Sequence, residues 1–131
     1  MAGVGDAGYL SIMDQLIAPA AQKFKPDMIL ISAGFDAHWQ DPLASMELSL
    51  TGYAQLAQEL VSIAQETCEG PILFVQEGGY MLDVLSHAVL NCLNGLLGND
   101  KIVDPFGLSP VKGSPDLVKM IKELQVLHLL K

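Results

Sequence analysis

The sequence has few basic residues. Seven Lys and Arg stand against 15 Asp and Glu among 131 residues, which gives a formal net charge of −8. Because no basic cluster is available to neutralise phosphates, nucleic-acid binding is not expected. An acidic surface can favour cationic partners, but it more often only keeps a protein in solution, so the charge does not select a function.

Cysteines and long apolar runs are also scarce. The two cysteines, Cys68 and Cys92, lack the spacing of metal ligands, and nothing calls for an oxidising compartment. No uncharged apolar stretch is long enough to span a membrane, and the first residues lack the basic and apolar regions of a signal peptide. These absences predict a cytoplasmic protein that binds no membrane.

Half of the residues are hydrophobic, and their periodicity predicts helices and strands. Apolar residues at helical spacing predict helices over 10–24, 52–67 and 81–97. Two apolar runs, Met28–Ile31 and Ile72–Val75, do not alternate with polar residues, which is typical of parallel strands buried on both faces.

A last helix is predicted to begin at Ser114-Pro115-Asp116, a capping residue followed by a proline and an acid, with Leu117 and Ile121 on its apolar face. The resulting order, α-β-α-β-α-α, predicts a parallel α/β protein. Since two strands alone make a marginal sheet, we expect the chain to be part of a larger one. Further sequence or another subunit would complete it.

Two loops follow the predicted strands and carry polar groups. The carboxyl ends of parallel strands meet at one edge of a sheet, so Asp36 and Tyr80 are expected on the same rim. Asp36 offers a carboxylate that can bind a metal or act as a base, and Tyr80 offers a hydroxyl donor beside Gly78 and Gly79. Taken separately, the aspartate also fits a loop cap and the tyrosine a packed aromatic after a turn. His38, on the first loop, is expected to be solvent exposed.

A glycine-rich start matches the spacing G-x-G-x-x-G of dinucleotide-binding loops through Gly3, Gly5 and Gly8. Only two residues precede the first glycine, so no strand leads into the turn. Asp27 lies at a suitable distance but before the next strand rather than at its end. A dinucleotide site is therefore not predicted.

The joint pattern of three motifs resembles a known family. Residues 32–38 read Ser-Ala-Gly-Phe-Asp-Ala-His, residues 41–43 Asp-Pro-Leu, and residues 77–80 Glu-Gly-Gly-Tyr. In this order they resemble the zinc-dependent histone deacetylase family, which includes acetylpolyamine amidohydrolases and acetoin-utilisation proteins. The resemblance implies a parallel-sheet, three-layer arginase/deacetylase-like fold. Residues 1–98 would be the C-terminal portion of such a domain, and 99–131 a loop and helix packing on it.

The same resemblance implies roles for five residues. Asp36 would complete a zinc site of two aspartates and one histidine, and the Tyr80 hydroxyl would donate to the substrate carbonyl and then to the oxyanion. Leu43 would line the substrate tunnel, with Gly78 and Gly79 forming the wall beside the tyrosine. The substrate would be an acetylated lysine or amine; a leucine at position 43 favours acyl-lysine, because some polyamine-selective relatives carry an acid there.

The chain also departs from the family pattern. It contains neither the Asp-x-His segment that supplies the other two zinc ligands nor the His-His pair that supplies the general base. The segment 1–6 resembles an interior stretch of the family. We therefore expect the isolated chain to be inactive and to need an N-terminal part or another subunit. The alternative is a non-catalytic truncated remnant or interaction domain with the same scaffold.

Overall fold

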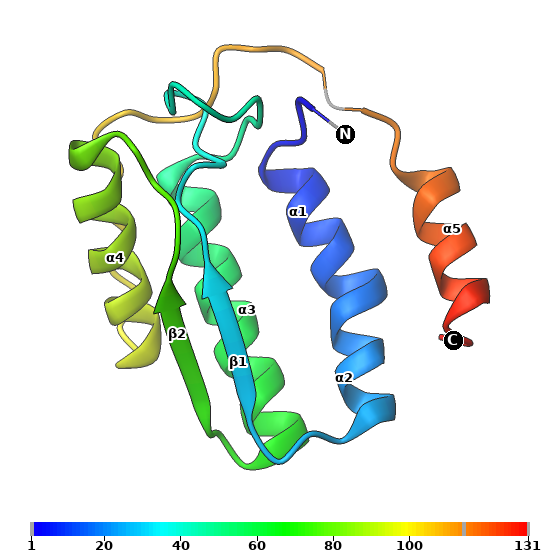
Figure 1. Ribbon diagram of the computed structural model, residues 1–131. Coiled ribbons are helices and arrows are strands. Elements are labelled where there is room, and N and C mark those ends of the chain that lie inside the picture. Colours follow the sequence, from blue (N-terminus) through cyan, green and yellow to red (C-terminus); the bar gives the residue numbers. More distant parts are fainter. Residues whose placement is uncertain (1, 114, 131) are drawn as a thin grey trace.

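A computed structural model describes residues 2–113 and 115–130, and its helices and strands follow the predicted order (Figure 1). The elements in chain order are α1 (Asp6–Ile12), η1 (Met13–Ile17), α2 (Ala18–Phe24), β1 (Ile29–Ala33), α3 (Leu50–Cys68), β2 (Ile72–Gln76), α4 (Leu82–Leu96) and α5 (Val118–Leu127). The predicted α-β-α-β-α-α succession is confirmed, since α1, η1 and α2 follow one another as a single rod.

The first helix begins at Asp6 rather than at Leu10, and its middle turn, η1, is a π-helix. Hydrogen bonds connect the start of this helix to the start of α3. The Asp6 carboxylate accepts hydrogen bonds from the Ser49 backbone N–H (2.8 Å) and hydroxyl (2.6 Å). The Ser49 hydroxyl in turn accepts the Gly52 N–H and caps α3. A carboxylate at the N-terminus of α1 also matches the sign of the helix dipole.

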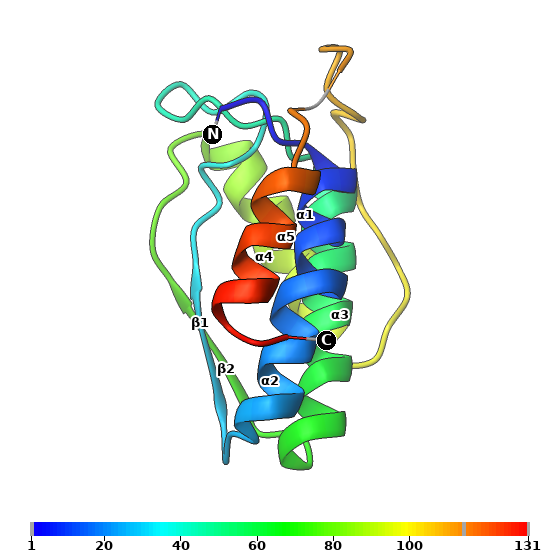
Figure 2. The same cartoon turned by 90° about the vertical axis from the view of Figure 1, so that its right-hand side faces the viewer.

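The two strands form a parallel pair, with Ile29 opposite Ile72 and Ala33 opposite Gln76. Helix α3 makes the crossover between them. Helices α3 and α4 pack on one face of the sheet, and the other helices lie on the same side (Figures 1 and 2). The main core lies between these layers. Its buried members are Phe35, Leu48, Leu50, Tyr53, Ala57, Val84, Ala88 and Cys92.

The prediction that both strands are buried on two faces is wrong for this chain. Side chains alternate along the strands, and the outward ones are exposed: Leu30 is 65% exposed and Leu73 50%. The physical reason is that every helix of the described residues lies on one side of the sheet (Figure 2). The runs lack alternation because the uncovered face is also apolar.

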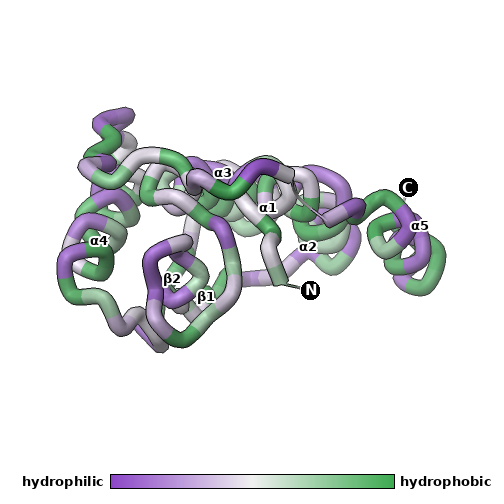
Figure 3. Tube along the Cα trace, turned by 90° about the horizontal axis from the view of Figure 1, so that it is seen from above, coloured by the Kyte–Doolittle hydropathy of each residue, from purple (hydrophilic) through white to green (hydrophobic). Residues whose placement is uncertain are grey.

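The C-terminal segment ends in α5, at the far end of the row of helices from α4 (Figure 3). The helix begins at Val118, after Leu117, so the predicted start at Pro115-Asp116 is wrong, and Ser114 lies outside the described residues. The Asp116 carboxylate accepts the N–H of Val118, the first residue of the helix, from two positions before it, so the signal lies a few residues ahead of the helix that it serves.

Helix α5 packs on the N-terminal rod. Ile121 of the helix and Leu117 just before it are buried with Val4 and Leu16. The Gln125 side-chain amide donates to the Gln15 carbonyl in η1 at 3.1 Å. Lys23 donates to the His128 and Leu129 carbonyls, which follow the end of α5. Apolar packing and three polar contacts thus fix the helix on the rod.

Candidate functional site

The loops that follow β1 and β2 lie side by side, as the topology predicted. Backbone hydrogen bonds continue past the strands: Glu77 N–H donates to the Ala33 carbonyl (3.0 Å) and Phe35 N–H to the Gly78 carbonyl (2.9 Å). Tyr53 of α3 also contacts the first of these loops, because its hydroxyl donates to the Gly34 carbonyl at 3.3 Å. Burial is the main reason that the pKa of Tyr53 is raised, so this hydroxyl stays protonated.

Asp36 lies between two glycines on this rim. A Cβ placed on Gly78 would come within 2.7 Å of Asp36 Oδ2, and one on Gly34 within 3.0 Å of Oδ1. Only glycines leave space for the carboxylate at these positions. In the described part of the chain, no hydrogen bond is made to the Asp36 carboxylate, which is half-buried. A half-buried carboxylate without protein donors is a suitable ligand for a cation.

The question for metal binding is whether this chain alone carries enough ligands for a metal ion. Among residues 2–113 and 115–130, no group of three His, Cys, Asp or Glu side chains is placed to hold a metal ion. Since a zinc site needs at least three protein ligands, the residues of this chain fit the part of one ligand and not the whole site. This agrees with the missing Asp-x-His segment in the sequence.

Tyr80 and Leu43 lie at the exposed edges of the same rim. Tyr80 is 56% exposed and Leu43 70%. Gly79 has φ +131°, and a Cβ there would lie 3.0 Å from Phe35 Cβ, so both its backbone conformation and its surroundings require glycine. The structure thus brings the loops of Asp36, Leu43 and Tyr80 to one edge of the sheet.

Asp41, the first residue of the Asp-Pro-Leu motif, has no predicted role of its own, yet its carboxylate contacts two loops. Its Oδ1 accepts the N–H groups of Leu43 (2.9 Å) and Ala44 (3.4 Å), as in an Asx turn. Its Oδ2 accepts the Tyr80 N–H at 2.9 Å, and the residue is only 8% exposed. The Asp-Pro pair signals the turn, but no local pattern reveals the contact with Tyr80.

His38 is fully buried, so the expectation of a solvent-exposed histidine is wrong. Its ring stacks on Trp39 and meets the edge of Phe106, which comes from the segment after α4. Burial lowers the pKa of His38, although the negative charges of nearby aspartates partly oppose that shift. The Trp39 indole donates to the Gly107 carbonyl at 3.1 Å, so this side chain anchors its loop.

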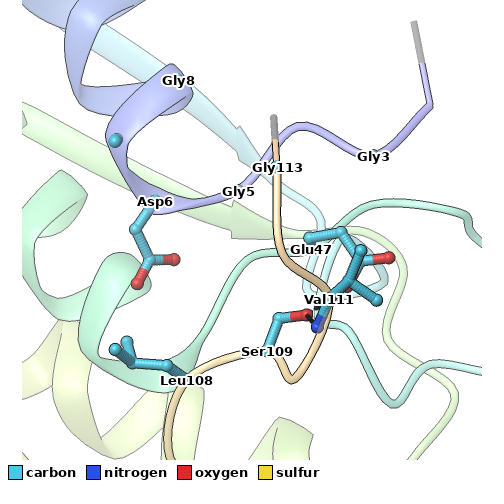
Figure 4. A pocket seen from close by; sticks show the side chains of 10 residues that line it. Gly3, Gly5, Asp6, Gly8, Glu47, Leu108, Ser109, Val111 and Gly113 are labelled. Atoms are coloured by element: carbon cyan, nitrogen blue, oxygen red, sulfur yellow. Dashed lines mark hydrogen bonds between the residues drawn. The ribbon is translucent and has the colours of Figure 1, made fainter. Parts of the chain in front are cut away.

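A separate hollow of about 240 Å³ lies beside the glycine-rich start of the chain (Figure 4). Its lining residues are Gly3, Gly5, Asp6, Ala7, Gly8, Glu47, Leu108, Ser109, Val111 and Gly113. Its acidic groups already have partners, because Ser109 donates to Glu47 and Ser49 to Asp6. It shares no lining residue with the Asp36 rim.

Comparison with known proteins gives a consistent family. Residues 1–96 match the family model described as "Histone deacetylase domain". The chain is 42% identical to "Histone deacetylase 14, chloroplastic" of Arabidopsis thaliana over 104 residues, 79% of this chain and 25% of that protein. It is 38% identical to a "Probable deacetylase" of Archaeoglobus fulgidus over 99 residues, 75% of this chain and 28% of that protein. The chain thus spans about a quarter of the length of these curated relatives.

Two solved structures are similar over almost the whole chain. The crystal structure of the HDA15 HD domain matches with a TM-score of 0.78 and 29% identity, covering 98% of this chain and 33% of that one. The structure of the histone deacetylase Clr3 matches with a TM-score of 0.77 and 28% identity, covering 98% and 20%. Both matches include α5, which lies beyond the residues that match the family model.

Proposed function

The chain belongs to the histone deacetylase family, and on that basis we propose that it supplies the C-terminal part of a zinc-dependent amidohydrolase site. Its parallel sheet and helices form part of the arginase/deacetylase fold of that family. The reaction would remove acetyl groups from acyl-lysine or acetylated amines, by hydrolysis of the amide to an amine and acetate. Leu43, which is apolar, favours an acyl-lysine substrate.

The observation that carries the proposal is the Asp36 carboxylate, which has no hydrogen-bond donor within residues 2–113 and 115–130 and lies between two glycines on the rim that also bears Tyr80. Asp36 would be one of three zinc ligands, and the bound metal would polarise the acetyl carbonyl and a water. The Tyr80 hydroxyl would donate a hydrogen bond to the carbonyl oxygen and to the oxyanion that follows. Leu43 would line the substrate tunnel, with Gly78 and Gly79 as the wall beside Tyr80.

The rest of the site would come from outside these residues, since the chain lacks the Asp-x-His and His-His segments. The uncovered apolar sheet face, with Leu30, Leu73 and Val75, supports a larger assembly that buries it. In this proposal residues 1–98 are the C-terminal portion of the deacetylase domain, and residues 99–131 are a loop and helix that pack on it.

The proposal also covers the partners and the location. We expect an acetylated lysine or amine as substrate, with no direct contact to nucleic acid or membrane. No helix in the described ranges is long and apolar enough to cross a bilayer. A cytoplasmic location is the prediction from composition, and imaging of the tagged chain tests it, since the Arabidopsis relative is named as chloroplastic.

The first experiment is to read the coding DNA upstream of the Met1 codon. An open frame in register that encodes His-His and Asp-x-His defines the complete enzyme. A stop codon without such a segment would instead favour a non-catalytic remnant or interaction domain, and the chain would then be tested in complex with the N-terminal part of the Arabidopsis relative.

The second experiment measures zinc-dependent deacetylation of an acetyl-lysine peptide by the assembled protein. Tyr80→Phe should lower turnover by about 10²–10³-fold, because one oxyanion donor is lost, while the zinc content stays the same. Ser62→Ala, which removes an exposed hydroxyl from α3, is the control. An assembled, zinc-loaded protein without activity, or full turnover by Tyr80→Phe, would refute the proposal.

A further inference from the structure

Two loops of the rim are connected by the side chain of a single residue. Asp41 Oδ1 accepts the Leu43 N–H (2.9 Å), and Asp41 Oδ2 accepts the Tyr80 N–H (2.9 Å). From this geometry we infer that Asp41 is a positioning residue, which holds the Tyr80 loop and the Leu43 loop at a fixed separation. The inference rests on the function proposed above and adds a residue to it.

The contact with Tyr80 goes beyond what an Asx turn requires. Such a turn uses one carboxylate oxygen, and Oδ1 alone serves Leu43 and Ala44. The second oxygen reaches a residue 39 positions further along the chain. Asp41 is only 8% exposed, so water has little access to replace these bonds.

The Tyr80 loop has little else to fix it. The backbone bond from Phe35 reaches Gly78, and helix α4 begins only after Met81. Between them lies Gly79 at φ +131°, a backbone conformation that only glycine adopts easily. In the described residues, the Asp41 carboxylate is the acceptor that fixes the Tyr80 backbone N–H. Met81, the next residue, packs on the main core, so the Asp41 carboxylate is the contact that fixes the Tyr80 backbone itself.

This arrangement makes a specific prediction for two variants. In Asp41→Asn, one oxygen and one NH₂ replace two oxygens, and an amide NH₂ cannot accept a hydrogen bond. The remaining oxygen is expected to keep the two local donors, Leu43 and Ala44, so the contact with Tyr80 is lost. Asp41→Ala loses the contacts on both sides.

Amide hydrogen exchange on the full chain tests the connection directly. In Asp41→Asn the Tyr80 amide should exchange about tenfold faster, since it loses a hydrogen bond to a charged acceptor, while the Leu43 amide stays protected. In Asp41→Ala both amides should exchange faster. Asp100→Asn, on an exposed loop, is the charge-matched control and should change neither. Equal loss of protection throughout the chain would show a general stabilising role and overturn the inference.

Steady-state kinetics of the complete, zinc-loaded enzyme test the consequence for catalysis. A misplacement of about 1 Å at a catalytic group can cost about 10²-fold in rate, so Asp41→Asn should lower kcat by 10-fold or more with little change in KM. Asp41→Ala should also raise KM, because the Leu43 loop is released. An unchanged kcat in Asp41→Asn would overturn the positioning role.

The two failures are distinguishable. If the unmodified, zinc-loaded enzyme does not deacetylate, the proposed function fails, and the exchange rates still decide whether Asp41 connects the loops. If the unmodified enzyme is active and Asp41→Asn matches it in both kcat and Tyr80 exchange, only the inference about Asp41 fails.

Discussion

Gly78 is the position at which a single methyl group should displace the candidate metal ligand. A Cβ on Gly78 would lie 2.7 Å from Asp36 Oδ2 and 3.0 Å from its Cγ. Gly78 is not in the left-handed region, so alanine meets a problem of space and not of backbone conformation. The added methyl group would therefore meet the carboxylate itself, and the Asp36 side chain would have to shift.

The expected size of the effect follows from these distances. To reach ordinary contact the carboxylate must move by about 0.7 Å, whereas zinc ligands keep their distances within about 0.2 Å. Overpacking of this kind costs about 1–3 kcal/mol, and the entropy that alanine removes from the unfolded chain returns about 0.4–1 kcal/mol. Gly78→Ala should therefore destabilise the chain by about 1–2 kcal/mol, and zinc binding by the assembled enzyme should weaken.

A double-mutant cycle on the 131-residue chain isolates the cause. Urea unfolding of Gly78→Ala, Asp36→Ala and the double variant gives their interaction energy. With Asp36 truncated, the clash disappears, and Gly78→Ala should be neutral or slightly stabilising. Gly95→Ala is the control, since its Cβ would only touch Ala57 at 3.4 Å, and its effect should add to that of Asp36→Ala. An equal cost of Gly78→Ala in both backgrounds would refute the reasoning.

Four further outcomes are expected from the core and its edges. Burial raises the pKa of the Cys92 thiol to about 11, so iodoacetamide at pH 8 should modify Cys68 first, and comparable rates on the native chain would contradict the burial of Cys92. The unfolded Cys92 thiol loses its proton at lower pH than the folded one. The free energy of unfolding should therefore fall as pH rises from about 9 to 11, and Cys92→Ala should reduce this fall in urea titrations. Asn91→Ala removes the buried amide that pairs with Leu50 and Val103, and should lower the free energy of unfolding by about 1–3 kcal/mol in urea; a neutral variant would contradict that role. Ile121→Ala should cost about 2–5 kcal/mol and expose the α5 amides to exchange before those of α3.

Local patterns were sufficient for the order of the elements and for the rim. Apolar spacing located the helices, and two parallel strands in a βαβ unit required Asp36 and Tyr80 to share an edge of the sheet. The order of the elements depends on the periodicity of contiguous residues, and the shared edge follows from that order once the two strands are parallel. The functional roles of these two side chains stay predictions.

Contacts between distant segments were not predictable in the same way. His38 is buried because Phe106, far along the chain, closes over its ring. The Asp41-Pro42 pair is typical of a turn, but the hydrogen bond from Tyr80 to the second Asp41 oxygen depends on the pairing of the two strands. At Pro115-Asp116 the signal predicts the helix but not its first residue: Asp116 accepts the Val118 N–H, and Leu117 is buried with Val4 before the helix begins.

The π-helical turn η1 sets the rotational phase between the two ends of the N-terminal rod. Both α1 and α2 contact α3, and η1 contacts α5. The relative rotation of α1, η1 and α2 therefore decides whether all three can make these contacts at once. A π turn holds about one residue more than an α-turn at nearly the same rotation, so deleting one residue from Met13–Ile17 would leave α1 and α2 almost in phase. One residue added to the regular turns of α1 would instead rotate Asp6 by about 100° relative to α2, and the start of α3 would lose its partner. A change of length is therefore tolerated better within Met13–Ile17 than in the regular turns beside it.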